Sequence, residues 1–314
     1  MTARIGLIGG RGYTGREILR HLSWRTDMEL VLASSRELAG QPVTATAPEL
    51  KSDLLFKAIS PRDLAGQALD AVILALPNGA GAPFVEAVSP ETVIVDLSAD
   101  YRFAPDWVYG LPEIYGREPL KGAKRIANPG CYATCGQLAI APVRTLLSGS
   151  AHVFGVSGYS GAGTTPSRKN DAAALKDNLI PYALTGHIHE QEMAHHLGRP
   201  VRFSPHVAPF FSGLITTVQM TLAEPSDLET LREIYETAYA DEALLSLNDV
   251  APEPAQISGQ PGSMIGGFSL GEDGRAFTVV SALDNLQKGA AVQALQNLSL
   301  ALDLPEGRYE NTPA

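Results

Sequence analysis

The chain has 314 residues, of which 45% are hydrophobic and 18% charged. With 24 Lys and Arg against 34 Asp and Glu, its formal charge of −10 argues against nucleic-acid and anionic-membrane partners, which need a basic face. No run approaches the roughly 20 apolar residues of a membrane span, and no signal peptide precedes the first apolar strand. We therefore expect a globular cytoplasmic protein, and the length favours two domains.

Short apolar runs alternate with helix-like segments through the N-terminal third of the chain. Residues 12–24 predict a helix with Ile18, Leu19 and Leu22 on one face. The apolar runs are rich in Val, Ile and Leu without clean alternation, which is typical of parallel strands covered on both faces. The sequence therefore predicts an α/β domain with a Rossmann-type parallel sheet. The predicted strands are residues 4–10, 28–35, 69–77 and 91–98.

A glycine-rich segment, GGRGYTG, lies between the first predicted strand and helix and fits the pattern G-x-G-x-x-G. Such glycines let the backbone turn sharply and approach a pyrophosphate, and the helix N-terminus supplies amides and a positive dipole. The context favours dinucleotide binding over an ordinary tight turn. The predicted contacts are Gly9, Gly10, Gly12, Tyr13, Thr14 and Gly15.

The end of the second predicted strand indicates which dinucleotide binds. NAD sites commonly place Asp or Glu there, to accept from the ribose 2′-hydroxyl. This chain instead has Ser34, Ser35 and Arg36, which suit a 2′-phosphate. We therefore predict NADP(H), with a solvated Arg36 that binds nothing as the alternative.

Both cysteines of the chain lie in the segment NPGCYATCG. One C-x3-C pair does not supply the four ligands of a metal site, and a disulfide between the two stays possible. The turn signal NPG followed by a helical pattern predicts Cys131 at a helix N-terminus, where the dipole favours thiolate. We predict that Cys131 is a nucleophile, with a buried structural thiol as the alternative, and that Cys135 is a small core residue.

After Cys131 the pattern changes to one that predicts an α+β domain with a mostly antiparallel sheet. Its strand candidates are residues 152–158, 201–223, 264–270 and 275–283. An amphipathic helix is predicted at residues 227–239, and a long helix at residues 285–304.

A thiolate beside a nicotinamide indicates a reaction class. Sulfur attacks an activated acyl carbon, phosphate leaves, and hydride reduces the thioester to an aldehyde. Such chemistry needs a proton donor and acceptor, usually histidine. The segment TGHIHEQEMAHHLG supplies His189 as our first candidate and His187 as the second, although a solvated histidine-rich helix is the alternative.

Together these motifs resemble the N-acetyl-gamma-glutamyl-phosphate reductase family, of the group that includes aspartate-semialdehyde dehydrogenase. The resemblance covers nearly the whole chain, through GYTG, LALPNG, VDLSADYRF, YGLPE, NPGCYAT, GVSGYSGAG and DNLQKGAAVQALQN. It implies an NADP-binding domain of residues 1–130 plus 286–314, and a catalytic and oligomerisation domain of residues 131–285. A homo-oligomer, dimer or tetramer, and a small-molecule acyl phosphate are the implied partners.

The resemblance also implies site residues. Cys131 would form the thioester, and Arg102 is the candidate for gripping the substrate phosphate or carboxylate, unless it only pairs with a neighbouring acid. Asn128, in the NPG turn, is a further substrate candidate. Additional cofactor contacts are implied at Pro77, Asn78, Ser157, Gly158, Asp284, Asn285 and Lys288.

Two segments depart from the family pattern. The histidine segment reads HIHEQE where many members have H-R-H-x-P-E, and GVSGYSGAGTTPSRKND is longer than usual. Arg168 and Lys169 are therefore candidates for holding the substrate carboxylate. The same chemistry on aspartyl or N-acetyl-aminoadipyl phosphate, or an NADP-responsive sensor without catalysis, are the alternative functions.

Overall fold

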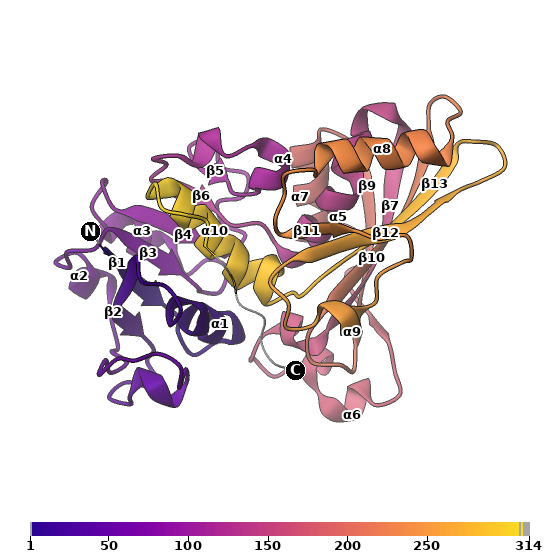
Figure 1. Ribbon diagram of the computed structural model, residues 1–314. Coiled ribbons are helices and arrows are strands. Elements are labelled where there is room, and N and C mark those ends of the chain that lie inside the picture. Colours follow the sequence, from indigo (N-terminus) through magenta and orange to yellow (C-terminus); the bar gives the residue numbers. More distant parts are fainter. Residues whose placement is uncertain (1, 308, 310–314) are drawn as a thin grey trace. The chain divides into compact units, whose positions relative to one another are not determined.

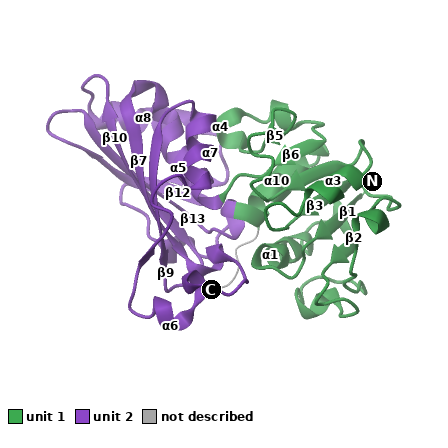
Figure 2. Ribbon diagram, turned by 180° about the vertical axis from the view of Figure 1, so that it is seen from behind, with its two compact units in different colours: residues 1–130, 290–309 green, residues 131–289, 310–314 purple. Residues whose placement is uncertain are grey.

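The computed structural model describes residues 2–307 and 309, which form two compact units (Figure 2). Unit 1 runs to Gly130 and resumes at Ala290–Tyr309, and unit 2 is Cys131–Gly289. Residues 1, 308 and 310–314, which we assigned to the NADP-binding domain, lie outside the described part. The functional assignment of the predicted domains stays a prediction.

Unit 1 is built on a six-stranded sheet in which every pairing is parallel. The strand order is β2-β1-β3-β4-β6-β5, so the chain moves outward from β1 first in one direction and then in the other. The loops after β1 and β3 therefore flank the point at which ligands bind such sheets. The strands are β1 (Ala3–Ile8), β2 (Met28–Ser34), β3 (Ala71–Leu74), β4 (Val93–Asp96), β5 (Val108–Tyr109) and β6 (Arg125–Ala127).

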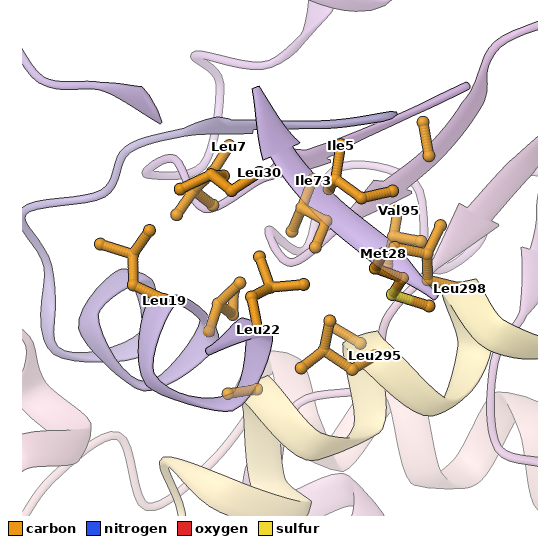
Figure 3. Packing of buried hydrophobic residues seen from close by; sticks show 14 of the residues in the cluster. Ile5, Leu7, Leu19, Leu22, Met28, Leu30, Ile73, Val95, Leu295 and Leu298 are labelled. Carbon is orange, nitrogen blue, oxygen red and sulfur yellow. The ribbon is translucent and has the colours of Figure 1, made fainter. Parts of the chain in front are cut away.

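Helices cover both faces of this sheet (Figure 1). Leu19 and Leu22 of α1 (Tyr13–Leu22) and Leu295 and Leu298 of α10 (Val292–Ala301) point toward the strands and are buried with Ile5 and its neighbours (Figure 3). A second cluster on the opposite face contains residues of α2 (Pro61–Leu64) and α3 (Ala82–Ala87). Because both faces are covered, most residues of these strands are apolar and buried. The remaining short elements of unit 1 are η1 (Val43–Ala45), α4 (Pro112–Tyr115) and η2 (Glu118–Leu120).

Unit 2 contains a seven-stranded sheet of order β11-β12-β13-β10-β7-β9-β8. Four of its pairings are antiparallel, while β7 with β9 and β11 with β12 are parallel. The strands are β7 (Leu147–Gly158), β8 (Ile180–Pro181), β9 (Val201–Ala208), β10 (Leu214–Leu222), β11 (Leu245–Leu247), β12 (Ser263–Leu270) and β13 (Ala276–Leu283).

One face of this sheet packs on α5, and α8 contacts α5 in turn. Tyr132 of α5 contacts the ring of Phe203 on β9, and Tyr235 of α8 donates its hydroxyl hydrogen to the Ala139 carbonyl. The helices of unit 2 are α5 (Cys131–Ile140), α6 (Ala172–Leu175), α7 (Ile188–Leu197), α8 (Leu228–Ala238) and α9 (Pro254–Ile257). Its short turns are η3 (Ala141–Leu146), η4 (Tyr159–Ala162) and η5 (Arg168–Asn170).

The predicted fold class is confirmed, with differences in detail. The helix predicted at residues 285–304 begins as a π-helical turn, η6 (Gln287–Ala291), before α10. A Cβ at Gly289 in this turn would lie 2.7 Å from the Cys131 Cβ, so this close packing depends on glycine. The parallel β7–β9 pairing was not predicted, because strand periodicity does not reveal strand direction. Within the described residues, no helix is long and apolar enough to cross a membrane.

Candidate active site

The glycine-rich turn joins β1 to α1 in unit 1. Gly9 has a φ of +98°, and a Cβ there would lie 2.2 Å from the Ala75 carbonyl oxygen. A Cβ at Gly15 would lie 2.5 Å from the Gly9 carbonyl oxygen, whereas one at Gly12 would meet nothing closer than 3.9 Å. The turn is therefore packed against its own helix and the end of β3, and it is open at Gly12.

The start of α1 has the properties of an anion site. Gly12 is the N-cap and brings no capping side chain, and the first turn, which includes Tyr13 and Thr14, contains no acidic residue. The dipole and amides at this end suit a pyrophosphate. The turn and the helix start together fit the dinucleotide that the motif predicts.

The carboxyl end of β2 lies against this turn, because the amides of Gly9 and Gly10 donate to the Ser34 carbonyl at 3.2 and 2.9 Å. Ser34 and Ser35 are buried, and the Ser35 hydroxyl accepts from the Leu38 amide at 3.2 Å. Arg36 is exposed.

Charges beside Arg36 favour an anion. The neighbouring Glu37 forms an ion pair with Arg11. Arg11, Arg36 and Glu37 thus carry a local charge of +1 near the end of β2.

Two hydrogen bonds join the loop after β3 to the loop after β4. The Asn78 Oδ1, next to Pro77, accepts from the Ala99 amide at 3.0 Å, and the Asp100 carboxylate accepts from the Gly79 amide at 2.7 Å. Asn78 therefore has a structural contact at the predicted position beside the cofactor.

Asp96, at the end of β4, is completely buried. The Ser98 hydroxyl donates to its Oδ2 at 2.5 Å, while its Oδ1 has no hydrogen-bond partner among the described residues. Burial raises the pKa of Asp96 to about 6 and Asp100 adds to this, while Ser98 and Arg102 act in the opposite direction.

Arg102 and Asn128 hold the turn that leads to Cys131. Arg102 is 7% exposed, and its guanidinium donates to the carbonyls of Asn128 and Leu97, each at 3.0 Å. The Asn128 Oδ1 accepts from Asn297 Nδ2 at 3.0 Å, and its own Nδ2 donates to the Ala290 carbonyl at 3.4 Å. Both side chains thus have structural partners, and their predicted substrate contacts stay predictions.

Cys131 is the first residue of α5, as predicted, and both cysteines are free thiols. Cys131 is partly exposed, whereas Cys135 is completely buried and lies 3.2 Å from both the Thr216 hydroxyl and the Ser281 carbonyl. Burial raises the pKa of Cys135 to about 12, so this thiol stays protonated. Cys135 is therefore the core residue that we predicted, and Cys131 alone has the exposure that a nucleophile needs.

The two candidate histidines lie at the start of α7 in unit 2, within an aromatic cluster. The His189 ring is 4.8 Å from the His187 ring and 6.0 Å from the ring of Tyr132, the residue after Cys131. Tyr182 contacts the His187 ring at 5.6 Å. Burial raises the pKa of Tyr182, and the charge of Cys131 adds to this. Unit 2 thus brings the predicted nucleophile and both histidines into one neighbourhood.

Lys169 belongs to this neighbourhood, because its Nζ lies 4.6 Å from the centre of the Tyr182 ring. Burial lowers the pKa of His187, and the charge of Lys169 adds to this. Arg168, the residue before Lys169, is exposed on η5.

The remaining predicted cofactor residues form buried contacts inside unit 2. Asp284 accepts from the Ser212 hydroxyl at 2.8 Å and from the Gly259 amide at 2.6 Å, while Asn285 donates to the Ser160 hydroxyl at 2.8 Å. These contacts hold loops together, so a role in cofactor binding stays a prediction. The whole set is buried and comprises Ser157, Gly158, Asp284, Asn285 and Lys288.

Sequence reasoning missed Tyr182, Asp96 and Asn297. A signal existed for Asp96, since it ends a parallel strand at the edge where ligands bind. For Asn297 the signal was a set of polar residues on an otherwise apolar helix pattern. Tyr182 lies in a loop without periodicity, so only the fold reveals it.

Two protein-family models match the chain, one in each unit. Residues 4–123 match the model described as semialdehyde dehydrogenase, NAD binding domain, and residues 131–285 match semialdehyde dehydrogenase, dimerisation domain.

Curated relatives match along nearly the whole chain. The N-acetyl-gamma-glutamyl-phosphate reductase of Xylella fastidiosa (strain 9a5c) is 51% identical, over 97% of this chain and 92% of its own. That of Xanthomonas oryzae pv. oryzae (strain MAFF 311018) is 50% identical over 97% of each.

Solved structures share the fold at much lower identity. A probable aspartate-semialdehyde dehydrogenase from Pseudomonas aeruginosa superposes with a TM-score of 0.77 at 19% identity, over 96% of this chain and 99% of its own. Aspartate semialdehyde dehydrogenase with NADP from Candida albicans gives 0.76 at 15%, with the same coverage.

Asp96 makes stability depend on pH. Its pKa is about 6 in the folded protein and about 3.9 in an unfolded chain, so its favourable contribution is complete below pH 4 and is lost as the pH rises through 6. The free energy of unfolding of Asp96→Asn minus that of wild type should therefore increase by about 2 to 3 kcal/mol between about pH 4 and pH 8. Urea unfolding at the two pH values measures this, and a difference that stays constant with pH would contradict it.

Proposed function

Because this chain belongs to the N-acetyl-gamma-glutamyl-phosphate reductase family, we propose that it reduces N-acetyl-gamma-glutamyl phosphate to N-acetylglutamate semialdehyde and phosphate, in arginine biosynthesis. The observation that carries this proposal is Cys131, a partly exposed thiol at the start of α5 in a chain about half identical to enzymes of that name. Its location in the cytoplasm stays a prediction.

Cys131 is the proposed nucleophile. The helix dipole and the amides of the first turn of α5 favour its thiolate, and that turn contains no acidic residue to oppose it. The thiolate attacks the acyl carbon, the carbon–phosphate oxygen bond breaks, and phosphate leaves with the electron pair. The product of this step is a thioester on Cys131.

Protons are exchanged by His189 in this proposal. Its ring lies beside Tyr132, which adjoins the nucleophile, and imidazole is the usual donor and acceptor near neutral pH. Lys169 is the cation best placed for the substrate carboxylate, because it lies in the same cluster. Arg168 and Arg102 stay candidates without that support.

We further propose NADPH as the cofactor, held in unit 1 by the glycine-rich turn and the end of β2. When bound, it supplies the hydride that reduces the thioester. Gly12 leaves space for the pyrophosphate, and the exposed Arg36 presents its guanidinium to a 2′-phosphate.

Self-association through unit 2 is also proposed, supported by its match to a dimerisation domain. A Cβ at Gly155 would meet the Tyr132 ring at 2.5 Å, so Gly155 faces α5 and its neighbour Phe154 lies on the other face of the sheet. Phe154 is 45% exposed there, which a second copy would cover.

The reverse reaction tests the chemistry. Wild type with NADP, phosphate and N-acetylglutamate semialdehyde should form NADPH only when phosphate is present. Cys131→Ser should lose at least about a thousandfold in rate, because a hydroxyl is a far weaker nucleophile. Absorbance of NADPH follows both.

Cys135→Ser is the matched control, because serine keeps the contacts with Thr216 and Ser281, and it should remain active. NADPH formation with aspartate semialdehyde alone would move the substrate to another acyl phosphate. No signal with either aldehyde, from folded protein that binds NADP, would overturn the proposal and favour a sensor.

Cofactor choice depends on Arg36. Arg36→Glu should weaken NADPH binding about tenfold or more, because it replaces a cation beside the 2′-phosphate with an anion, and should change NADH binding little. Titration of cofactor fluorescence measures both affinities. Arg62→Glu, at an exposed position on α2, makes the same change in net charge, and an equal loss of NADPH affinity there would count against the assignment.

The oligomer depends on the open face of unit 2. Phe154→Glu should lower the mass measured by light scattering to that of a monomer, because the charge would be desolvated in the interface. Leu228→Glu, at an exposed position on α8, should keep the wild-type mass. Unchanged mass for Phe154→Glu would place the interface elsewhere.

A further inference from the structure

His187 occupies the N-cap of α7. Its backbone is extended, with φ −60° and ψ 141°, and its Nδ1 accepts a hydrogen bond from the His189 amide at 3.1 Å. A ring nitrogen accepts only when it carries no proton, so Nδ1 is unprotonated in this arrangement. The imidazole thus performs the task usually given to Ser, Asp or Asn at a helix start.

Glu190 reinforces the same turn from the other side. One carboxylate oxygen accepts from the Gly186 amide at 3.2 Å, and the other accepts from the Phe203 amide on β9 at 2.8 Å. A residue on each side of His189 therefore fixes the first turn of α7, and Glu190 also fastens it to the sheet.

The surroundings of His187 keep it neutral. Its ring packs against Tyr182, Phe203 and His189. Burial lowers its pKa to about 4, and the charge of Lys169 acts in the same direction, whereas that of Glu190 opposes it. Near neutral pH such a group has no proton to exchange at Nδ1 and is a poor general acid.

We propose that His187 is a positioning residue, which caps α7 and so sets the place of His189, rather than the acid or base of the reaction. The inference rests on the proposed function for the role of His189. The cap itself rests only on the geometry of α7.

Two substitutions separate capping from proton transfer. Asparagine places its Oδ1 near the position of the imidazole Nδ1 and is a preferred N-cap, whereas alanine cannot accept the hydrogen bond. His187→Ala should lower kcat about tenfold and speed hydrogen exchange of the amides at residues 189–191 by a similar factor. His187→Asn should restore both to within about threefold of wild type.

The pH profile of kcat should keep the acidic and alkaline limbs of the wild-type profile in His187→Ala and His187→Asn, because neither variant removes His189, the proposed proton donor and acceptor. His195→Ala, in the last turn of the same helix, is the control and should change neither readout. Loss of a limb in His187→Asn, or a loss of kcat as large as in His187→Ala despite normal exchange, would overturn the proposal.

Exchange is measured without substrate, so it tests the cap even in an inactive protein. Wild type without turnover would refute the proposed function, whereas unchanged exchange in His187→Ala would refute the cap. If the alanine variant does not fold, His187→Gln takes its place, because its longer side chain is a poor cap. Rapid exchange in the glutamine variant and slow exchange in the asparagine variant support the proposal, and equal exchange in both overturns it.

Discussion

The buried side-chain amides of Asn297 and Asn128 connect the segments of unit 1 that lie next to Cys131 in the sequence or pack against them. Asn297 Nδ2 on α10 donates to the Gly110 carbonyl at 2.9 Å and to Asn128 Oδ1 at 3.0 Å, and both asparagines are at most 1% exposed. Each such group left without a partner would cost about 1 to 3 kcal/mol, so breaking either contact would destabilise this part of unit 1. They fix the C-terminal helix, the loop after β5 and the turn that ends one residue before Cys131.

The fold was largely predictable because its strands and helices carry strong periodic signals. Runs such as residues 69–77 are apolar enough to indicate strands covered on both faces, and the glycine pattern identified the turn between β1 and α1. The candidate site was predictable only in part. The place of Cys131 at a helix start follows from local turn chemistry, whereas the neighbourhood of His187, Tyr182 and Lys169 depends on how distant segments pack.

Local electrostatics explain how an acidic chain can hold anions. Helices α1 and α5 each begin without an acidic residue in the first turn, at the positions proposed for a pyrophosphate and for a thiolate. The field of a helix end is short in range, so it acts within its own turn while the net charge of −10 acts over the whole surface. The same chain can therefore repel anions at a distance while the start of α1 favours a pyrophosphate and the start of α5 favours the Cys131 thiolate.

The division of unit 1 into two separated stretches has a consequence for synthesis. Among the described residues unit 2 is one continuous stretch and can fold as it leaves the ribosome, but the parallel sheet lacks α10 until residues 292–301 are made. Until then, the apolar surface that Leu295 and Leu298 finally cover stays open to water and to other chains. Closing unit 1 across the 159 residues of unit 2 also carries the entropy of a long loop. The newly made chain therefore passes through a stage at which the parallel sheet of unit 1 needs protection from aggregation.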